Sequence, residues 1–203
     1  EWLAEFNVSI YDEITHRGLV RSLYIRHAEA SGEVMVTIIA NGSALPQTQA
    51  LIEALCGACS AITSVILNIN RDKTNVLLGE ECQTLWGKST ITDQLCGLSF
   101  SLSPLSFYQI NRRGAEQLYG IAREFAALSG GEVLLDLYCG AGTIGLSMAH
   151  QARQLVGVEI VSDAVENARQ NAIQNGIANA RFICADATEA AAQLEAEGIA
   201  PLN

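Results

Sequence analysis

Several features that would indicate a membrane protein, an exported protein or a nucleic-acid-coating protein are missing from this chain of 203 residues. No apolar run approaches the roughly 18 to 20 residues that a membrane-spanning helix needs. The first residues, Glu1 to Glu5, lack a basic stretch followed by an apolar one, so nothing indicates export. Positive charge is also scarce, because 12 Lys and Arg against 22 Asp and Glu give a net charge of −10. We therefore expect no membrane or DNA partner, and an RNA partner would need a local basic patch or a further domain.

The six cysteines do not indicate a disulfide framework. The chain is long enough to bury a core, and its hydrophobic content of 49% supports one, so it needs no covalent staples. Reduced thiols and a cytoplasmic location are therefore expected. Cys56 and Cys59 form a C-x-x-C pair, but no second pair or suitably spaced histidine accompanies it. Core packing is favoured over metal binding there, and no metal ligand is predicted.

The first hundred residues predict a small α+β domain. Two β-rich runs, 19–26 and 33–40, are joined by a small, polar segment that is typical of a hairpin. The pattern then predicts a helix over 47–56, a buried strand over 64–69, a turn over 70–75, and a second hairpin from 91–95 and 98–102. No linker or repeat marks a boundary. The change of pattern alone places an α+β domain at 1–100 and a second domain at 101–203.

The second half alternates helix and strand. Asn111 can cap a helix over 112–128 that Gly130 and Gly131 would stop, and Ser162 can cap a helix that ends at Gly176. The remaining predicted elements are strands over 132–136, 154–160 and 181–184 and helices over 142–150 and 187–197. Repeated strand-helix units imply an α/β fold with a parallel, Rossmann-like sheet that binds ligands at the carboxyl ends of its strands.

The number of these strands is low for such a sheet. Doubly wound domains normally have five or more strands, and only three candidates occur before the last residue. The first residue is Glu rather than Met. We therefore expect the chain to be a fragment of a longer protein whose sheet is incomplete here.

A glycine loop follows the first of these strands, at Leu-Leu-Asp-Leu-Tyr-Cys-Gly-Ala-Gly-Thr over 134–143. Residues 140–145 match G-x-G-x-x-G, and Glu159 lies where a ribose-binding acid belongs. Asp136 distinguishes between cofactors, because its carboxylate would repel the pyrophosphate of a dinucleotide. S-adenosylmethionine has no phosphate, its amino group and sulfonium tolerate a carboxylate, and its ribose diol can use Glu159 as a double acceptor. The loop therefore favours S-adenosylmethionine over a nicotinamide cofactor.

Each of these residues also has a purely structural interpretation. Gly140 and Gly142 can serve a tight strand-to-helix turn, and Asp136 can cap the helix that follows. Tyr138 can pack in the core or press on the apolar surface of a ligand. Asp186 can cap the last helix or face an adenine amino group. Their combination with the acid at the end of the second strand favours a ligand site.

A nonapeptide makes a family resemblance specific. It reads Ser-Pro-Leu-Ser-Phe-Tyr-Gln-Ile-Asn over 103–111 and is followed by Gln-Leu-Tyr over 117–119 and the glycine loop. With upstream segments 18–21, 32–36, 70–75 and 85–87, it resembles the bacterial RNA uracil-5-methyltransferase family. The version that acts on 23S ribosomal RNA in Gram-positive bacteria is most similar, and the tRNA enzyme is the near alternative. The resemblance implies a class I S-adenosylmethionine-dependent methyltransferase fold and an RNA partner, ribosomal RNA first.

The resemblance also implies roles for matched residues. Gln109 would hold the methionyl end of the cofactor, although without the family pattern it would be taken for a loop amide bonded to backbone. Thr143 stands where some relatives use Asn. The full predicted cofactor-binding set is Gln109, Tyr138, Glu159, Asp186, Asp136, Gly140, Gly142 and Thr143.

The chemistry that the resemblance implies is attack of a cysteine thiolate on C6 of uracil, methyl transfer to C5, and removal of the C5 proton by a base. In the family the nucleophilic cysteine follows an Asp-Pro-Pro-Arg type motif, which this sequence lacks. We therefore expect nucleophile and base beyond Asn203, assign no catalytic residue, and predict that the fragment alone is inactive. Cys139 lies in the cofactor loop and is not expected to be the nucleophile.

Two further expectations concern the longer protein. Relatives often carry an iron-sulfur cluster whose cysteines lie mainly upstream, so such a cluster is possible there but not in this fragment. The competing interpretation is a non-catalytic interaction module that keeps the nucleotide fold without the chemistry.

Overall fold

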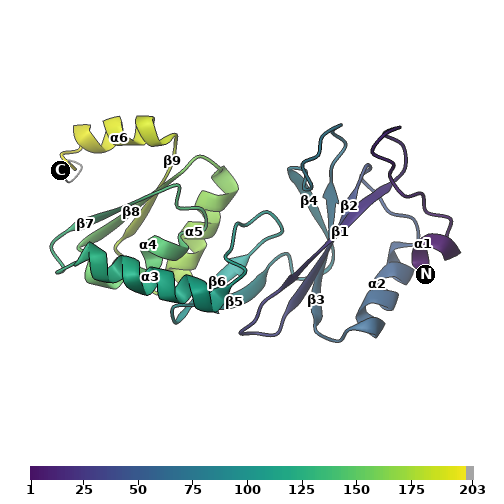
Figure 1. Cartoon of the computed structure of the whole chain (residues 1–203), viewed down its shortest axis with the longest axis horizontal. Coiled ribbons are helices and arrows are strands. Elements are labelled where there is room, and N and C mark those ends of the chain that lie inside the picture. The colour runs from purple at the N-terminus through teal and green to yellow at the C-terminus, as the bar shows by residue number, and fades with distance from the viewer. Residues whose placement is uncertain (200–203) are drawn as a thin grey trace. The chain divides into compact units, whose positions relative to one another are not determined.

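The computed structural model describes residues 1–199, which divide into two compact units (Figure 1). Unit 1 comprises residues 1–93 and 102–105, and unit 2 comprises residues 94–101 and those from 106 onward. The boundary expected at residue 100 falls inside the stretch where the two units alternate along the chain. Each unit has its own sheet.

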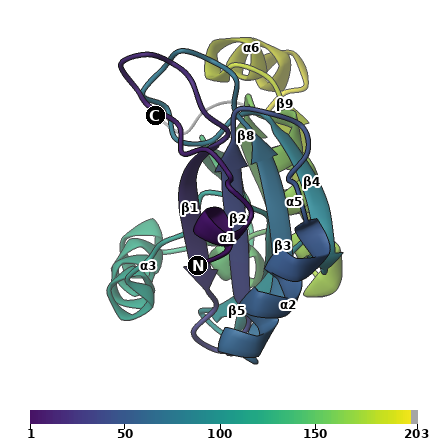
Figure 2. The same cartoon turned by 90° about the vertical axis from the view of Figure 1, so that its right-hand side faces the viewer.

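Unit 1 is built on a four-stranded sheet in the order β1-β2-β3-β4. β1 (Val20–His27) and β2 (Val34–Ala40) are antiparallel, which confirms the first predicted hairpin. β3 (Ile62–Ile69) lies parallel to β2 and is reached through α2 (Thr48–Ala58). In Figure 2, α2 and the short α1 (Trp2–Glu5) lie in front of this sheet.

One strand of this sheet was not predicted. β4 (Glu81–Gly87) pairs antiparallel with β3, with Trp86 opposite Val65. Most of its residues are exposed, because it is an edge strand that packs little apolar surface. A strand that is polar on both faces carries no alternation of apolar and polar residues, so its pattern resembles a loop.

The main core of unit 1 lies between α2 and one face of the sheet. Burying these apolar side chains is the main source of stability for a sheet of this size, at roughly 25 cal/mol per Å² of apolar surface removed from water. The buried members of the cluster are Val36, Ile38, Ala40, Leu45, Leu51, Ile52, Ile62, Val65 and Leu67.

β5 (Ile91–Leu95) and β6 (Leu98–Leu102) form a separate two-stranded sheet, as predicted. Their connection is Cys96-Gly97, and φ is positive at both residues, 53° and 77°. Two-residue hairpin turns of this kind match the twist of the flanking strands. Cys96 therefore adopts a conformation that glycine or asparagine usually fills.

Unit 2 is built on a three-stranded parallel sheet in the order β7-β8-β9. These strands are β7 (Val133–Leu137), β8 (Gln154–Glu159) and β9 (Ala180–Cys184). The intervening and flanking helices are α3 (Arg112–Ala126), α4 (Thr143–Met148), the 3-10 turn η1 (Ala149–Gln151), α5 (Ser162–Gln174) and α6 (Ala187–Ala196). The predicted alternation of strand and helix and the parallel sheet are confirmed.

Two helix-end predictions in unit 2 are confirmed. The Asn111 side chain accepts a hydrogen bond of 2.9 Å from the amide of Gly114 and caps α3. Gly176, with φ of 66°, follows α5 in a left-handed conformation, and its amide donates to the carbonyl of Ile173. The next amide, that of Ile177, donates back to the helix as well, so the end of α5 is a Schellman motif.

Two other helix-end predictions are wrong. Ser162 does not cap α5 but is its first residue, and Val161 precedes it without a side-chain cap. α3 ends at Ala126, with Ala127 in a left-handed conformation at φ of 44°, so it stops before the glycines expected to end it. Among residues 1–199 no helix combines the length and apolar character needed to cross a membrane.

Candidate cofactor site

The candidate site lies at the carboxyl ends of the strands in unit 2. β7 ends at Leu137, which pairs with Val158, and the next residue of β8, Glu159, pairs with Cys184 of β9. Because the three strands are parallel, the segments that follow them emerge at one edge of the sheet, where such folds bind ligands. The fold thereby brings together the loop 138–143, Glu159 and Asp186.

The loop after β7 has an unusual backbone. Tyr138, Gly140 and Gly142 all have positive φ, at 59°, 54° and 80°. For Tyr138 this conformation costs roughly 1–2 kcal/mol, yet its side chain is 76% exposed and gains little packing in return. Strain of this kind collects at ligand-binding segments. Tyr138 is therefore not a core residue, which removes one of its two interpretations.

The two loop glycines have different surroundings. A Cβ on Gly142 would lie 3.1 Å from the side chain of Leu146, so this glycine faces the packed interior. A Cβ on Gly140 would meet nothing within 4 Å. The loop therefore has an open side at Gly140, where a ligand can approach the backbone closely.

Asp136 binds the first turn of α4, the helix that follows the loop. Its Oδ2 accepts a hydrogen bond of 2.9 Å from the amide of Gly145 in the first turn of α4. A Cβ on Gly145 would lie 2.8 Å from the same oxygen, so the contact requires glycine there. Burial raises the pKa of Asp136, and the hydrogen bond from Gly145 acts in the opposite direction. The helix-capping role of Asp136 is thus realised in the structure.

Glu159 joins the ends of β7 and β8. Its Oε2 accepts from the amide of Gly140 at 3.1 Å, and its Oε1 accepts from the amides of Ile160 at 2.9 Å and Val161 at 3.0 Å. Since each carboxylate oxygen has two acceptor positions, one position remains on Oε2. A ribose diol that used Glu159 twice would displace one of these amides.

Asp186 follows β9 and lies beside Glu159 along the sheet edge. Ala185 directly precedes Asp186, and its amide donates to the carbonyl of Glu159 at 3.1 Å. The Asp186 side chain caps α6, with Oδ1 accepting from the amide of Thr188 at 2.8 Å. Hydrogen bonds from Thr188 lower the pKa of Asp186. The carboxylate is exposed, so capping and contact with a ligand are compatible.

Gln109 and Thr143 are linked through a residue that was not predicted for the site, Tyr119 of α3. The hydroxyl of Tyr119 lies 3.1 Å from Oγ1 of Thr143, the first residue of α4. Burial raises the pKa of Tyr119, while hydrogen bonds with Thr143 and Gln109 lower it. The side chain is only 3% exposed. Its spacing of four residues from buried Ala115 indicates a core position, and only the hydroxyl distinguishes it from a simple core aromatic.

Cys139 is buried beneath the loop. Burial, followed by the charges of Asp136 and Glu159, raises the pKa of its thiol to about 12. A thiol in this state is neutral at pH 7, whereas nucleophilic attack needs the thiolate. Its space depends on Gly157, where a Cβ would lie 3.0 Å from Sγ. The geometry of Cys139 suits packing rather than nucleophilic chemistry.

Residues 1–199 contain no group of three or more His, Cys, Asp or Glu side chains arranged to hold a metal ion. Cys56 and Cys59 are free thiols, half-buried and exposed respectively.

The parallel sheet, the glycine loop and the acid at the end of the second strand define unit 2 as a Rossmann-like methyltransferase fold. Residues 128–199 match the sequence model of a family described as "Methyltransferase domain". The matched segment begins shortly after α3, runs to the end of the described residues, and contains β7, β8 and β9.

The chain is similar to other proteins over nearly its whole length. An uncharacterized RNA methyltransferase of Staphylococcus aureus is 45% identical over 199 residues, which are 98% of this chain and 44% of that protein. One of Clostridium tetani is 41% identical over the same share of the chain and 43% of its own length. The chain thus spans less than half the length of these relatives.

Solved structures give the same class of fold. The tRNA (uracil-54, C5)-methyltransferase of Pyrococcus abyssi, in complex with S-adenosyl-L-homocysteine, is 28% identical with a TM-score of 0.73 and covers 91% of this chain and 44% of its own. The complex of aTrm5 with tRNALeu has a TM-score of 0.53 at 16% identity and covers 83% of this chain and 48% of its own, which supports the fold alone.

Proposed function

We propose that the chain is the cofactor-binding part of an S-adenosylmethionine-dependent RNA methyltransferase that methylates C5 of uridine in ribosomal RNA. One observation carries this proposal: the loop 138–143 is strained and open at Gly140, and Glu159 lies hydrogen-bonded beside the opening. The similarity to a uracil C5 methyltransferase in complex with S-adenosyl-L-homocysteine supports it.

The residues at the edge of the sheet fit this cofactor. The free acceptor position of Glu159 suits a ribose hydroxyl, and the open side of Gly140 gives room for close approach. The exposed ring of Tyr138 offers an apolar surface, and the exposed carboxylate of Asp186 suits an adenine amino group. Gln109, which hydrogen-bonds with Tyr119, would hold the methionyl end, as the family resemblance implies. Asp136 at the end of β7 disfavours a dinucleotide, because its carboxylate would repel the pyrophosphate.

The roles of these residues are binding and orientation. S-adenosylmethionine supplies an electrophilic methyl group on a sulfonium. Holding it in one orientation against a second reactant is worth several kcal/mol of the barrier, because it removes the entropy of a bimolecular encounter. Glu159 contributes by fixing the loop at Gly140, and Asp136 contributes by fixing the first turn of α4 at Gly145. Nucleophile and base are not assigned to any described residue.

The RNA class has two candidates. The resemblance in the nonapeptide and the upstream segments favours 23S ribosomal RNA. The Pyrococcus abyssi neighbour acts on uracil-54 of tRNA, which makes tRNA the second candidate. A protein of the relatives' full length, given S-adenosylmethionine with a labelled methyl group and transcripts of each RNA, would distinguish them by which transcript acquires 5-methyluridine. A non-catalytic interaction module would label neither.

The cofactor assignment is tested first by calorimetric titration of the chain with S-adenosyl-L-homocysteine and, separately, with NAD. Saturable binding of S-adenosyl-L-homocysteine alone is expected. Preference for NAD would overturn the assignment. Binding of neither would favour the non-catalytic module.

A further inference from the structure

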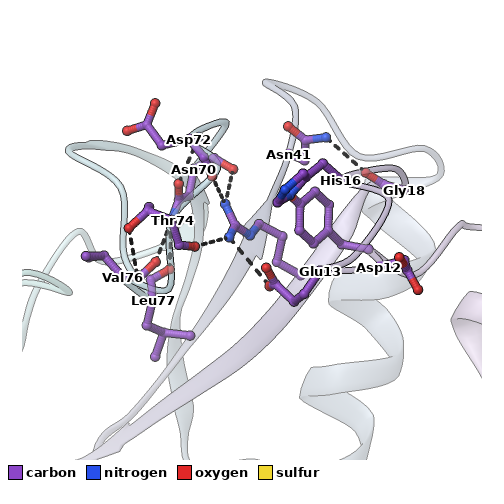
Figure 3. A network of polar contacts seen from close by, with 12 residues as sticks. Asp12, Glu13, His16, Gly18, Asn41, Asn70, Asp72, Thr74, Val76 and Leu77 are labelled. Carbon is purple, nitrogen blue, oxygen red and sulfur yellow. Dashed lines mark hydrogen bonds and ion pairs between the residues drawn. The ribbon is translucent and has the colours of Figure 1, made fainter.

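Two loops at one end of the four-stranded sheet of unit 1 are joined by one buried cation, Arg21 of β1. Its side chain is 4% exposed. Nη1 donates to the carbonyls of Asn70 at 3.1 Å and Asp72 at 2.8 Å, and Nη2 donates to the carbonyl of Thr74 at 2.9 Å. Figure 3 shows these carbonyls on one loop facing the neighbouring loop of Asp12 and His16.

The second loop contacts Arg21 from the other side. Oε1 of Glu13 lies 3.5 Å from Nη2, and the guanidinium stacks 4.4 Å from the centre of the Tyr11 ring. The hydroxyl of Tyr11 lies 3.0 Å from Nδ1 of His16. We name the segments 11–18 and 70–79 the Arg21-bridged loops.

Loop 70–79 is also held from within. Nδ2 of Asn70 donates to the carbonyls of Val76 at 2.9 Å and Leu77 at 3.1 Å. Oδ1 of Asn68 accepts from the amide of Gly79 at 2.8 Å, and a Cβ on that glycine would lie 2.1 Å from a carbonyl oxygen of β3. Both asparagines are buried. Buried side chains thus fix a segment without helix or strand, so its exposed side chains are pre-organised and lose less entropy on binding a partner.

The exposed side chains that these loops present include three cations: Arg17, Arg71 and Lys73. All three are exposed, and none has a side-chain hydrogen bond or ion pair within the described part of the chain. The other cations of unit 1 are engaged, since Arg21 is buried and Lys88 binds Glu33.

Arg26 is engaged as well. Its Nη2 donates to the hydroxyl of Tyr24 at 2.9 Å. The unpaired positive charge of unit 1 is therefore concentrated on the Arg21-bridged loops.

The loops carry three acids: Asp12 and Glu13 are engaged within the loops, whereas the exposed Asp72 lies between Arg71 and Lys73 in the sequence. Oδ1 of Asp12 accepts from the amides of Ile14 at 3.1 Å and Thr15 at 2.6 Å, and Glu13 is paired with Arg21. Hydrogen bonds from Thr15 lower the pKa of Asp12, as expected for a carboxylate that serves the turn.

We propose that the Arg21-bridged loops are a contact surface for the phosphodiester backbone of single-stranded RNA, with Arg71, Lys73 and Arg17 as the phosphate-binding side chains. This inference rests on the proposed function and adds the place where unit 1 meets the RNA. Cations that contact phosphates fix the register of a nucleic acid without reading its sequence. In a chain of net charge −10, a local set of unpaired cations directs a polyanion to one place.

The test compares two double variants that remove the same charge. Arg71→Gln with Lys73→Gln alters loop 70–79, and Arg123→Gln with Arg153→Gln alters two other exposed arginines, in unit 2. The probe is a fluorescent single-stranded RNA of mixed sequence and about 20 nucleotides, with affinity measured by anisotropy over a series of salt concentrations. Losing two phosphate contacts lowers the salt slope by about 1.4, since each contact contributes about 0.7 for single strands.

We expect the loop variant to lose affinity and salt slope and the unit 2 variant to keep both. Equal losses in the two variants, no loss in the loop variant, or no RNA binding by the unaltered chain would overturn the proposal. Arg21→Lys keeps the charge but cannot make the three carbonyl contacts, so it is expected to weaken RNA binding at unchanged net charge. Titration with S-adenosyl-L-homocysteine on the same proteins reports separately on the proposed cofactor site.

Discussion

Gly140 donates its backbone amide to Oε2 of Glu159 at 3.1 Å, and this contact joins the loop after β7 to the end of β8, next to the bond from the amide of Cys139 to the carbonyl of Val158. The same carboxylate holds the amides of Ile160 and Val161 through Oε1. Glu159 therefore shapes the loop that it is proposed to serve. Its substitution removes the support of the loop together with the proposed ligand contact.

Replacing Glu159 by Ala is expected to weaken binding of S-adenosyl-L-homocysteine on the order of tenfold or more, because hydrogen bonds to charged groups are worth roughly 1.5–3 kcal/mol. Calorimetric titration measures the change. Glu124→Ala removes an exposed acid from α3 and serves as the control. Unchanged affinity in Glu159→Ala would contradict the assigned site.

Tyr119→Phe removes the hydroxyl that lies between Thr143 and Gln109. We expect a loss of about 1 kcal/mol of unfolding free energy and a several-fold weaker binding of S-adenosyl-L-homocysteine. Thr143→Val and the double variant complete a cycle. Because the two side chains share one hydrogen bond, the double variant should lose less than the sum of the single ones. Additive losses in binding would mean that Tyr119 does not position Thr143.

The strands of both main sheets could largely be predicted from sequence because most of them are apolar runs bounded by turn residues. β4 escaped prediction since its residues are exposed and polar at the edge of the sheet. The cap expected from Ser162 is wrong because α5 begins at Ser162 itself, and the amide of the preceding Val161 is bound by Glu159. Local patterns identify elements, but they do not reveal which side chain from a preceding strand satisfies a helix start.

The functional residues, too, could be proposed from sequence only in part. The glycine loop and Glu159 form a local motif of fixed spacing, so they could be proposed from sequence alone, and their roles in binding stay predictions. Tyr119, and Arg21 in unit 1, could not be proposed from sequence, because their importance comes from tertiary contacts. The partners of Arg21 are 49 to 53 residues away in the chain. A polar contact over such a separation leaves no periodic signal.

Gly157→Ala is expected to destabilise unit 2 by roughly 1–3 kcal/mol. The added Cβ would lie 2.5 Å from the ring of Phe182 and 3.0 Å from Sγ of Cys139. Urea unfolding followed by circular dichroism measures the loss. Tryptophan fluorescence should change little, because both tryptophans belong to unit 1. Gly57→Ala in α2, where a Cβ meets nothing within 4 Å, is the control and should not destabilise.

The turn before β7 predicts a pH dependence. Hydrogen bonds from Ser129, with those from the amides of the turn, lower the pKa of Glu132 from 4.5 to about 2. A lowered pKa in the folded state stabilises above the ordinary pKa and is lost as pH falls through the folded one. The stability advantage over Glu132→Gln should be full at pH 7 and disappear between 4.5 and about 2. Urea titrations across this range test it, with Glu124→Gln as the control. A stability difference that stays constant across this pH range would contradict the lowered pKa of Glu132.

The last prediction concerns Cys139, the cysteine of the cofactor loop. Its thiol has a pKa raised to about 12, so only about one molecule in ten thousand carries the thiolate at pH 8. Iodoacetamide reacts with the thiolate. Exposed Cys59 and Cys184 should therefore be alkylated in the folded chain while Cys139 is not, as measured by mass spectrometry of the peptides.

In denaturant, Cys139 should react as fast as the other two, which shows that the fold protects it. Equal rates in the folded chain would contradict both its burial and its raised pKa. Such a result would reopen the possibility of a nucleophile in the loop. Protection of Cys139 would instead agree with a thiol that packs against Gly157 and supports the backbone turn, leaving the chemistry of methyl transfer to groups elsewhere.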